Sequence, residues 1–229
     1  MANAFRLRYT LRNKKKKVAY SMVKISGLAT GLLQENCYVI YNEKHCLIVD
    51  PGSDAENIIA KVEETGTKPV AILLTHCHYD HIGALEEIRA HYQVPVFVSP
   101  LEQEWLGNPE LNGSVGMSQY SNKGIICVPA ENEFEIRDYN IEGITFRVVP
   151  TPGHSIGSVS FIFDDFVVVG DALFKGSIGR SDLYTGDFDT LIESITTQLL
   201  VLPDEMPVYA GHGDATTIGH EKATNPYLT

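Results

Sequence analysis

Residues 73–83 read LLTHCHYDHIG and place four candidate metal ligands within six positions: His76, His78, Asp80 and His81. Imidazole nitrogens and carboxylate oxygens are ligands that proteins offer to Zn(II), Fe(II) or Mn(II). Because side chains in an extended segment alternate with a period of two, His76 and His78 point to the same side and can reach one metal. Asp80 and His81 lie at the turn into a helix and can point to a second metal nearby.

A purely structural explanation of this cluster requires several buried polar groups at once, and each costs free energy unless it is paired. The metal-binding interpretation is therefore the stronger one. His45, His91 and His220 have no such neighbours in the sequence, and we assign them to ordinary core or surface positions. Cys77 alternates with two of the candidate ligands, so we expect its side chain to point away from the metal.

Three further candidate ligands follow apolar runs or Pro-Gly turns: His154 in TPGHS, Asp171 in VVGDALF and His212 in YAGHG. Each is weak evidence by itself, since a Pro-Gly turn can end in histidine and Gly-Asp turns are common. They gain weight from the first cluster, which contains fewer ligands than two metals require.

These residues are positioned by a mixture of strands and helices. Short apolar runs such as VAILL and FVVVG predict strands that are covered on both faces. Apolar residues at helical spacing predict helices at 54–65 and 81–92. Residues 100–133, which include Trp105, are the least regular part and indicate a loop-rich insertion that lines the site. We therefore predict one α/β domain over residues 22–229.

Charge divides the chain into two unequal parts. Residues 1–21 contain seven Lys or Arg and no acid, and we expect a disordered extension or a start assigned too early, with Met22 as the first residue. A transit peptide or a nucleic-acid-binding arm is the alternative. Residues 22–229 contain eleven basic residues against 29 acidic ones, a net charge of -18. This acidic body disfavours nucleic acid or an anionic membrane as a partner.

Other features of the composition point to a cytoplasmic protein. There is no apolar run of about 18 residues that could form a transmembrane helix. The four cysteines, Cys37, Cys46, Cys77 and Cys127, show no CxxC spacing and no secretion signal precedes them. We expect reduced thiols.

Taken together, VDPG at 49–52, THCHYDH, TPGHS, GDALF and GHG at 211–213 resemble the metallo-β-lactamase superfamily. The stretches GSIGRSDLYTGD at 176–187 and TIGHEKATNPY further resemble the short bacterial glyoxalase II-like hydrolases. The resemblance implies an αββα sandwich, with two mixed β-sheets flanked by helices and the metals at one edge between the sheets.

The resemblance also implies a role for each candidate residue. One metal would be held by His76, His78 and His154, a second by Asp80, His81 and His212, with Asp171 bridging both. Asp50 would orient a ligand from behind, and Arg180 would bind a substrate carboxylate. The implied cofactors are two divalent metal ions; we expect zinc, although the same ligands accept Fe(II) or Mn(II).

Such a centre implies hydrolysis of a small molecule. A water bound to two metals has its pKa lowered to about 7, so a bridging hydroxide can attack an acyl carbon. A thiolate, with a pKa of about 8.5, leaves with little acid assistance. The expected substrate is therefore a thioester such as S-lactoylglutathione. Asp80 is either a ligand of the second metal or the acceptor of the proton after attack.

Two departures from the long glyoxalase II enzymes put glutathione specificity in question. Their helical extension with basic glutathione-binding residues has no counterpart after His212, and Asp182 stands where they have a tyrosine. The alternatives are a persulfide dioxygenase with one iron on His76, His154 and Asp171, a hydrolase of a phosphodiester, nucleic acid or lactam, and a non-catalytic metal-binding or partner-binding module. The oligomeric state is left open.

Overall fold

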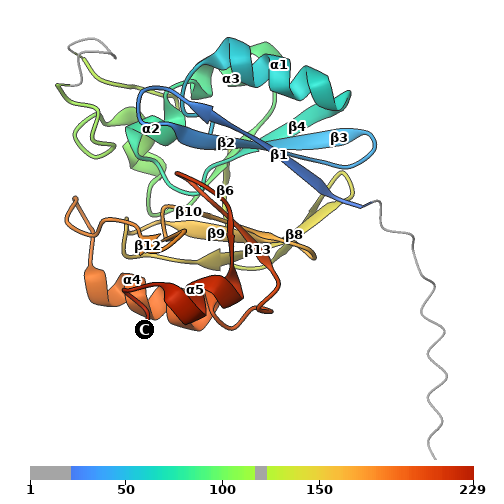
Figure 1. The fold of residues 1–229 in the computed structure, drawn as a ribbon. Helices are drawn as coiled ribbons and strands as arrows, with labels where there is room; N and C mark the ends of the chain where they lie inside the picture. Colours follow the sequence, from blue (N-terminus) through green and yellow to red (C-terminus); the bar gives the residue numbers. More distant parts are fainter. Residues whose placement is uncertain (1–21, 117–122) are drawn as a thin grey trace, which may run out of the picture.

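The computed structural model describes residues 22–116 and 123–229. Two six-stranded sheets pack face to face, and helices cover the outer face of each sheet (Figure 1). The predicted αββα sandwich of two mixed sheets is confirmed. The basic segment 1–21 lies outside the described residues, so the prediction of a disordered extension stays a prediction.

The first sheet supplies the strand that leads to the LLTHCHYDHIG segment. It contains, in spatial order, β1 (Lys24–Thr30), β2 (Glu35–Tyr41), β3 (His45–Val49), β4 (Lys68–Leu73), β5 (Val96–Val98) and β6 (Asn132–Glu133). The pairs from β1 to β3 are antiparallel, and those from β3 to β6 are parallel. Parallel strands of one sheet end at the same edge, which brings the residues after β4 to that edge.

The second sheet contains, in spatial order, β14 (Thr216–Thr217), β13 (Pro207–Ala210), β10 (Val167–Gly170), β9 (Val159–Ile162), β8 (Ile144–Pro150) and β7 (Asp138–Ile141). Its strands are antiparallel neighbours except for the parallel pair of β10 and β13. These two parallel strands therefore deliver Asp171 and His212 to a common edge. A hairpin of β11 (Leu173–Phe174) and β12 (Ser177–Ile178) follows β10.

Alternation of side chains along the strands builds three apolar layers. On β3, Ile48 faces the outer helices whereas Leu47 faces the other sheet, and both are fully buried. This period of two is expected for strands that are covered on both faces. In the second sheet, Val167 and Val169 pack toward the helices and Val168 packs between the sheets.

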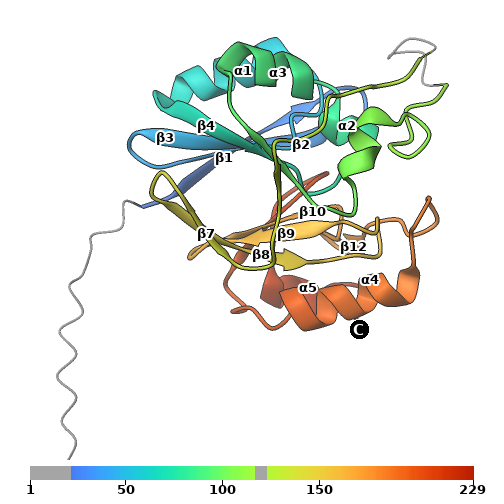
Figure 2. The ribbon, with the colours of Figure 1, turned by 180° about the vertical axis from the view of Figure 1, so that it is seen from behind.

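The outer helices pack against these layers on opposite sides of the molecule (Figure 2). α1 (Ala55–Thr65) and α3 (Leu85–Tyr92) cover the first sheet, while α4 (Phe188–Ser194) and α5 (Ile218–Thr224) cover the second. α4 continues into a π-helical segment, η3 (Ile195–Leu199). Along the insertion, the regular helical structure among the described residues is a short 3-10 helix, η1 (Gln103–Gly107).

The helix predicted at 81–92 is wrong in one respect, because the structure divides it in two. α2 (Tyr79–Ile82) is a single turn, and α3 begins only at Leu85. Between them, the N–H of Ala84 donates to the carbonyl of Pro51 at 3.0 Å rather than to its own helix. A tertiary hydrogen bond therefore interrupts a helix that the apolar periodicity alone extends.

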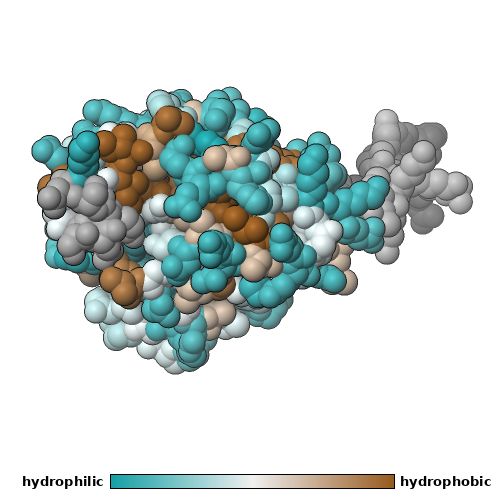
Figure 3. Space-filling view, turned by 90° about the horizontal axis from the view of Figure 1, so that it is seen from above, coloured by the Kyte–Doolittle hydropathy of each residue, from teal (hydrophilic) through white to brown (hydrophobic). Residues whose placement is uncertain are grey.

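The molecular surface above α1 and α3 is mainly hydrophilic, and hydrophobic areas are separated by hydrophilic side chains (Figure 3). Within residues 22–116 and 123–229, none of the helices combines the length and the apolar character that crossing a bilayer demands.

Candidate metal centre

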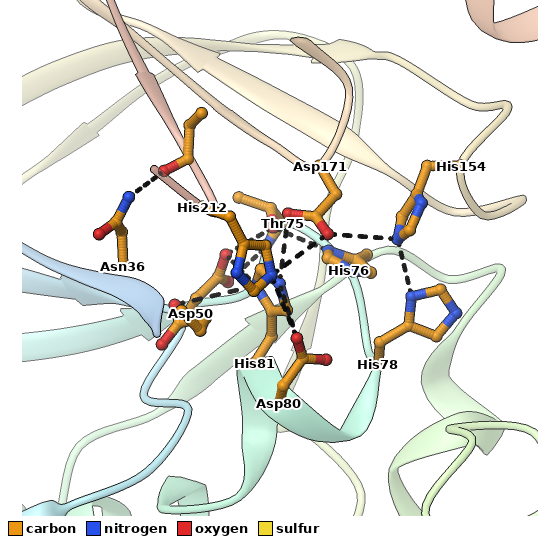
Figure 4. Close-up of polar contacts among 12 residues, drawn as sticks. Asn36, Asp50, Thr75, His76, His78, Asp80, His81, His154, Asp171 and His212 are labelled. Carbon is orange, nitrogen blue, oxygen red and sulfur yellow. Dashed lines mark hydrogen bonds and ion pairs between the residues drawn. The ribbon is translucent and has the colours of Figure 1, made fainter. Parts of the chain in front are cut away.

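All seven predicted ligands lie together at one edge of the sandwich (Figure 4). His76 and His78 follow β4, and Asp80 and His81 lie in the single turn of α2. The other three come from the second sheet, where they follow strand ends: His154 after β8, Asp171 after β10 and His212 after β13. Two sheets thus contribute ligand-type side chains to the same position.

The first group of side chains is made only of imidazoles. One nitrogen from each of His76, His78 and His154 lies within 4.8 Å of the others, and all three residues are buried. The Nδ1 of His78 is 2.8 Å from the Nε2 of His154. Three convergent imidazole nitrogens form a donor set that suits zinc or iron.

The second group contains a carboxylate. Asp80, His81 and His212 also offer ligand atoms within 4.8 Å of one another. The Nε2 of His212 is 3.2 Å from Asp80 Oδ2. These two groups correspond to the two sets that the resemblance implies, and Asp50, His76 and His81 form a third group with ligand atoms within the same distance of one another.

Asp171 lies between the two groups. Its Oδ2 is 3.6 Å from Nε2 of His154 in the first group and 3.5 Å from Nε2 of His212 in the second. Its Oδ1 is 3.4 Å from Nε2 of His81. One carboxylate thus faces both groups, which is the position required of a bridging ligand.

Hydrogen bonds behind the first group determine which nitrogen two of its imidazoles present. Thr75 Oγ1 donates to Asp50 Oδ2 at 2.6 Å and so can only accept from His76 Nδ1, which lies 3.1 Å away. The Nδ1 of His154 donates to the carbonyl of Arg180 at 2.7 Å. In both rings the Nε2 lone pair is left to point into the centre.

The second group has the same arrangement. The Nδ1 of His81 donates to Asp50 Oδ2 at 3.0 Å, and the Nδ1 of His212 donates to the carbonyl of Leu33 at 3.1 Å. Four imidazoles thus have an acceptor on the outer nitrogen and turn the inner nitrogen toward the centre. Metal-binding histidines characteristically donate their second N–H to such outer partners.

Close approach of the backbone completes the second group. A Cβ at Gly211 would overlap the Asp171 carboxylate and press on the His81 ring, so this position requires glycine. The adjacent loop is held by Asn36 of β2, whose amide donates to the carbonyls of Ala210 and Gly213 at 3.0 and 2.9 Å. The first sheet thereby fixes the segment that carries His212.

The residues present fit a cation. Among the described residues, His76 Nε2, His81 Nε2 and Asp171 Oδ1 are buried polar atoms without a hydrogen-bond partner, and all three point into the centre. Leaving such atoms unpaired costs free energy, and a cation would satisfy them together. The geometry therefore supports a divalent metal centre, while the donor set does not distinguish zinc from iron or manganese.

Electrostatics favour the deprotonated form, which metals bind, in five of the seven candidate ligands. Burial lowers the pKa of His76 and lowers that of His78 to about 3. Burial alone would raise the pKa values of Asp80 and Asp171, but the neighbouring His81 and other imidazoles lower both below the ordinary range. Burial alone would lower the pKa of His81, but the Asp171 and Asp80 carboxylates raise it well above its ordinary value, so a cation bound here would replace the proton that these carboxylates hold on His81.

Two residues predicted to support the centre have contrasting positions. Asp50 is buried and contacts His81 from behind, the relation that the resemblance implies. Arg180 lines the pocket over the centre, but its guanidinium already donates to both oxygens of Asp182, at 2.7 and 2.8 Å. Its binding of a substrate carboxylate remains a prediction.

Glu102 is an organising residue that the sequence analysis missed. Its fully buried carboxylate accepts hydrogen bonds from the N–H groups of Cys77 and Gly157, at 2.6 and 2.8 Å. Nothing in PLEQEWLG marks this residue, because its partners are distant in sequence. Cys77 is buried in the core against the outer helices, as its alternation with the histidines predicts.

A pocket of about 660 Å³ opens over the metal centre. This volume lies in the range of small-molecule binding sites. Residues 110–113 form part of its wall, so the insertion does line the site as predicted. Trp105 lies behind this wall, 5.7 Å from the rings of both His78 and Tyr184 by centroid distance.

Comparison with known families agrees with this geometry. The profile of the metallo-beta-lactamase superfamily matches residues 30–212, which include every candidate ligand. The chain belongs to this superfamily. Among curated relatives, a probable metallo-hydrolase of Streptococcus pyogenes is 44% identical over 98% of this chain and 99% of its own length. A hydroxyacylglutathione hydrolase of Haemophilus influenzae, GloC, is 36% identical over 85% of this chain and 93% of its own length.

Solved structures extend the comparison to the fold. The crystal structure of the BLEG-1 B3 metallo-beta-lactamase is 41% identical, with a TM-score of 0.85 over 90% of this chain and all of its own. A di-iron-bound structure of TTHA1623 is 35% identical, with a TM-score of 0.76 over 89% of this chain and all of its own. The superfamily and the convergent histidines and aspartates support a metal-dependent hydrolase.

Proposed function

We propose that this protein is a dinuclear-metal hydrolase that cleaves a thioester of a small molecule, such as S-lactoylglutathione. The single observation that carries the proposal is the convergence of two three-residue groups on one shared carboxylate, Asp171. A site for one metal has no need of the second group.

The roles of the side chains follow from this arrangement. His76, His78 and His154 would hold one cation, and Asp80, His81 and His212 the other, with Asp171 touching both. When bound, the cations would supply Lewis acidity and lower the pKa of water enough to provide hydroxide at neutral pH. Because outer hydrogen bonds fix four of the five imidazole rings, the protein brings most of its ligands to the reaction already oriented.

The bond changes of the proposed reaction balance without another reactant. The oxygen of water adds to the acyl carbon, the C–S bond breaks with its electron pair on sulfur, and a carboxylate and a thiol result. Asp80 is placed either to hold the second cation or to accept the proton released by water, since its ionised oxygen faces the centre beside His212.

Two observations support a thioester over other hydrolysable bonds. The Haemophilus relative is named a hydroxyacylglutathione hydrolase, which cleaves a thioester. In addition, the described residues that line the pocket include no Lys or Cys, and the two tyrosines among them, Tyr79 and Tyr184, are not members of the ligand groups, so no proton donor for a poor leaving group accompanies the ligands. A thiolate, with a pKa of about 8.5, leaves without one.

Hydrolysis by purified, metal-counted protein tests this proposal. The substrates are S-D-lactoylglutathione and the corresponding thioester of N-acetylcysteamine, and thiol release is followed beside an Asp80→Ala variant. We expect turnover of at least one substrate by protein with two metals, and loss of about 100-fold or more in the variant. No turnover of either substrate at full metal content would refute the proposal.

A matched control separates this effect from a general loss of charge. Asp164 lies in the exposed turn between β9 and β10, away from the ligands. Asp164→Ala is expected to retain both metals and wild-type turnover.

A lactam is the second candidate substrate, favoured by the 41% identity to a B3 metallo-beta-lactamase. Nitrocefin hydrolysis by the same metal-loaded protein distinguishes the two, and the larger kcat/KM identifies the better assignment. Oxygen consumption with glutathione persulfide by protein containing one iron would instead assign the dioxygenase alternative.

A further inference from the structure

We infer that the preferred substrate is a thioester whose groups on both sides of the reacting carbonyl are uncharged and largely apolar, rather than a thioester of an anionic thiol. This inference rests on the proposed function, because it concerns the same pocket and the same bond. Three observations support it: the walls of the pocket are apolar, the Arg180 side chain that lines the pocket is paired with Asp182, and further carboxylates lie nearby.

The walls of the pocket are apolar side chains from separate parts of the chain. Leu33 comes from the loop between β1 and β2, Leu111 from the insertion, Phe174 from β11, and Leu183 and Tyr184 from the segment before α4. Leu33 and Tyr184 remain 49% and 62% exposed. Covering such surface with an apolar ligand is favourable, whereas a charged ligand gains nothing from it.

The cationic side chain in this lining is already neutralised. Arg180 is the one Lys or Arg among the described residues that line the pocket. Its Nε and Nη2 donate to Asp182 at 2.7 and 2.8 Å, which is the bidentate geometry that a substrate carboxylate would need. If a substrate carboxylate joined Asp182 beside this guanidinium, two carboxylates would share one positive charge, and the local charge would become negative.

The surroundings of the pocket are acidic as well. Glu110 contributes a carboxylate to the lining. Lys175, next in sequence to Phe174, donates to Asp214 at 3.1 Å and so is paired too. A glutathione thioester brings two carboxylates and one ammonium group, a net negative charge, and a coenzyme A thioester brings phosphates. Away from the metal ligands, such anionic groups would lie near the carboxylates of Glu110 and Asp182, whereas a neutral thiol such as N-acetylcysteamine meets no like charge there.

A series of neutral thioesters tests the apolar preference on the full-length, metal-loaded protein. The probes are the acetyl, butanoyl and hexanoyl thioesters of N-acetylcysteamine. We expect kcat/KM to rise about two- to fourfold for each added methylene, as burial of a methylene predicts. The lactoyl thioester of N-acetylcysteamine should also be cleaved with a higher kcat/KM than S-D-lactoylglutathione.

The outcomes separate this inference from the proposed function. A preference for the glutathione thioester, or no gain with acyl length, overturns the inference but leaves thioester hydrolysis established. If no thioester is hydrolysed by protein with two metals, both this inference and the proposed function are refuted.

Variants of the walls locate the effect. Leu33→Ser and Leu183→Ser are expected each to reduce the ratio of hexanoyl to acetyl kcat/KM about threefold, because each removes apolar surface. A ratio is used because partial metal loss affects both substrates alike. Val201→Ser is the matched control, since Val201 is 68% exposed but lies outside the pocket. An unchanged ratio in both pocket variants would overturn the inference.

The pairing of Arg180 has its own test. Asp182→Asn removes the carboxylate that pairs with the guanidinium. We expect kcat/KM for S-D-lactoylglutathione to rise about two- to fivefold relative to kcat/KM for the lactoyl thioester of N-acetylcysteamine, which is the range of an exposed ion pair. A ratio that stays the same in this variant would overturn the role assigned to the Arg180–Asp182 pair.

Discussion

Glu102 accepts a hydrogen bond from the backbone N–H of Cys77 at 2.6 Å, within the segment that carries the first two candidate ligands. Its other carboxylate oxygen accepts from Ser155 Oγ and from the N–H of Gly157, in the loop that carries His154. One buried side chain therefore joins the two loops that supply the all-histidine group.

Glu102→Gln is expected to lower metal affinity about 10- to 100-fold, the usual cost of losing an outer partner of a metal site. The amide has one acceptor oxygen, so its NH2 group would face either the N–H of Cys77 or that of Gly157. The measurement is metal content by inductively coupled plasma mass spectrometry after dialysis against graded chelator, with circular dichroism to verify folding.

Glu104→Gln is the matched control, because Glu104 is exposed and lies two residues away. It should retain the metal affinity of the wild type. Equal affinity in both variants would show that Glu102 does not position the ligands.

The contrast between Glu102 and the seven candidate ligands shows what the sequence could predict. Each histidine or aspartate ligand lies close to a strand end or in a Pro-Gly turn, and apolar runs make the strands visible. Glu102 and Glu104 look alike in PLEQEWLG, since what distinguishes Glu102 is contact with residues 25 and 53 to 55 positions away. The break before α3 was missed for the same reason, because a carbonyl from Pro51 causes it.

The paired state of Arg180 could be foreseen only in part. Asp182 lies two residues later in the sequence, but nothing in the pattern shows whether the guanidinium faces this carboxylate or the pocket. The structure shows a bidentate pair at the edge of the pocket, with the Arg180 side chain 61% exposed. Side-chain orientation in an irregular loop is set by tertiary contacts, which local patterns do not encode.

Metal stoichiometry should separate the two groups. His154→Ala removes a ligand of one group and His212→Ala a ligand of the other, so each variant is expected to retain about one metal per chain. Asp171→Ala should weaken both sites, because this carboxylate faces both groups. Metal counting after desalting measures this, and His91→Ala, at an exposed position, should keep two metals.

If His154→Ala and His212→Ala both lost all metal while remaining folded, the two sites would be strongly coupled rather than separable. If neither lost any, the assignment of these ligands would be wrong.

Asp50→Asn is expected to lower the stability of the protein and the metal affinity of the second group, which contains His81. The carboxylate of Asp50 accepts from the N–H and Oγ1 of Thr75 and from Nδ1 of His81. An amide cannot accept all three, so at least one buried donor is left unpaired, at a cost of about 1–3 kcal/mol in the free energy of unfolding. Asparagine is the suitable replacement because Asp50 has a φ of 49°, a region that asparagine tolerates and alanine does not.

Urea unfolding of the metal-free variant measures the stability loss, and chelator competition measures metal affinity. Asp54→Asn is the control, since Asp54 also has a positive φ, of 57°, but is exposed. A loss of stability shared equally by both variants would point to the backbone rather than to the contact with His81.

The cysteines provide a test of the core rather than of the centre. All four thiols are free and buried. Burial raises the pKa of Cys77 well above its ordinary value and raises that of Cys127 to about 12, so at pH 8 almost no thiolate is present.

We therefore expect native protein to release almost no thionitrobenzoate from Ellman's reagent, and protein unfolded in guanidinium to release four equivalents. Ile136→Cys, at a 58% exposed position, should add one fast equivalent to the native protein. Rapid reaction of a wild-type thiol without unfolding would contradict the burial of the four cysteines in the core.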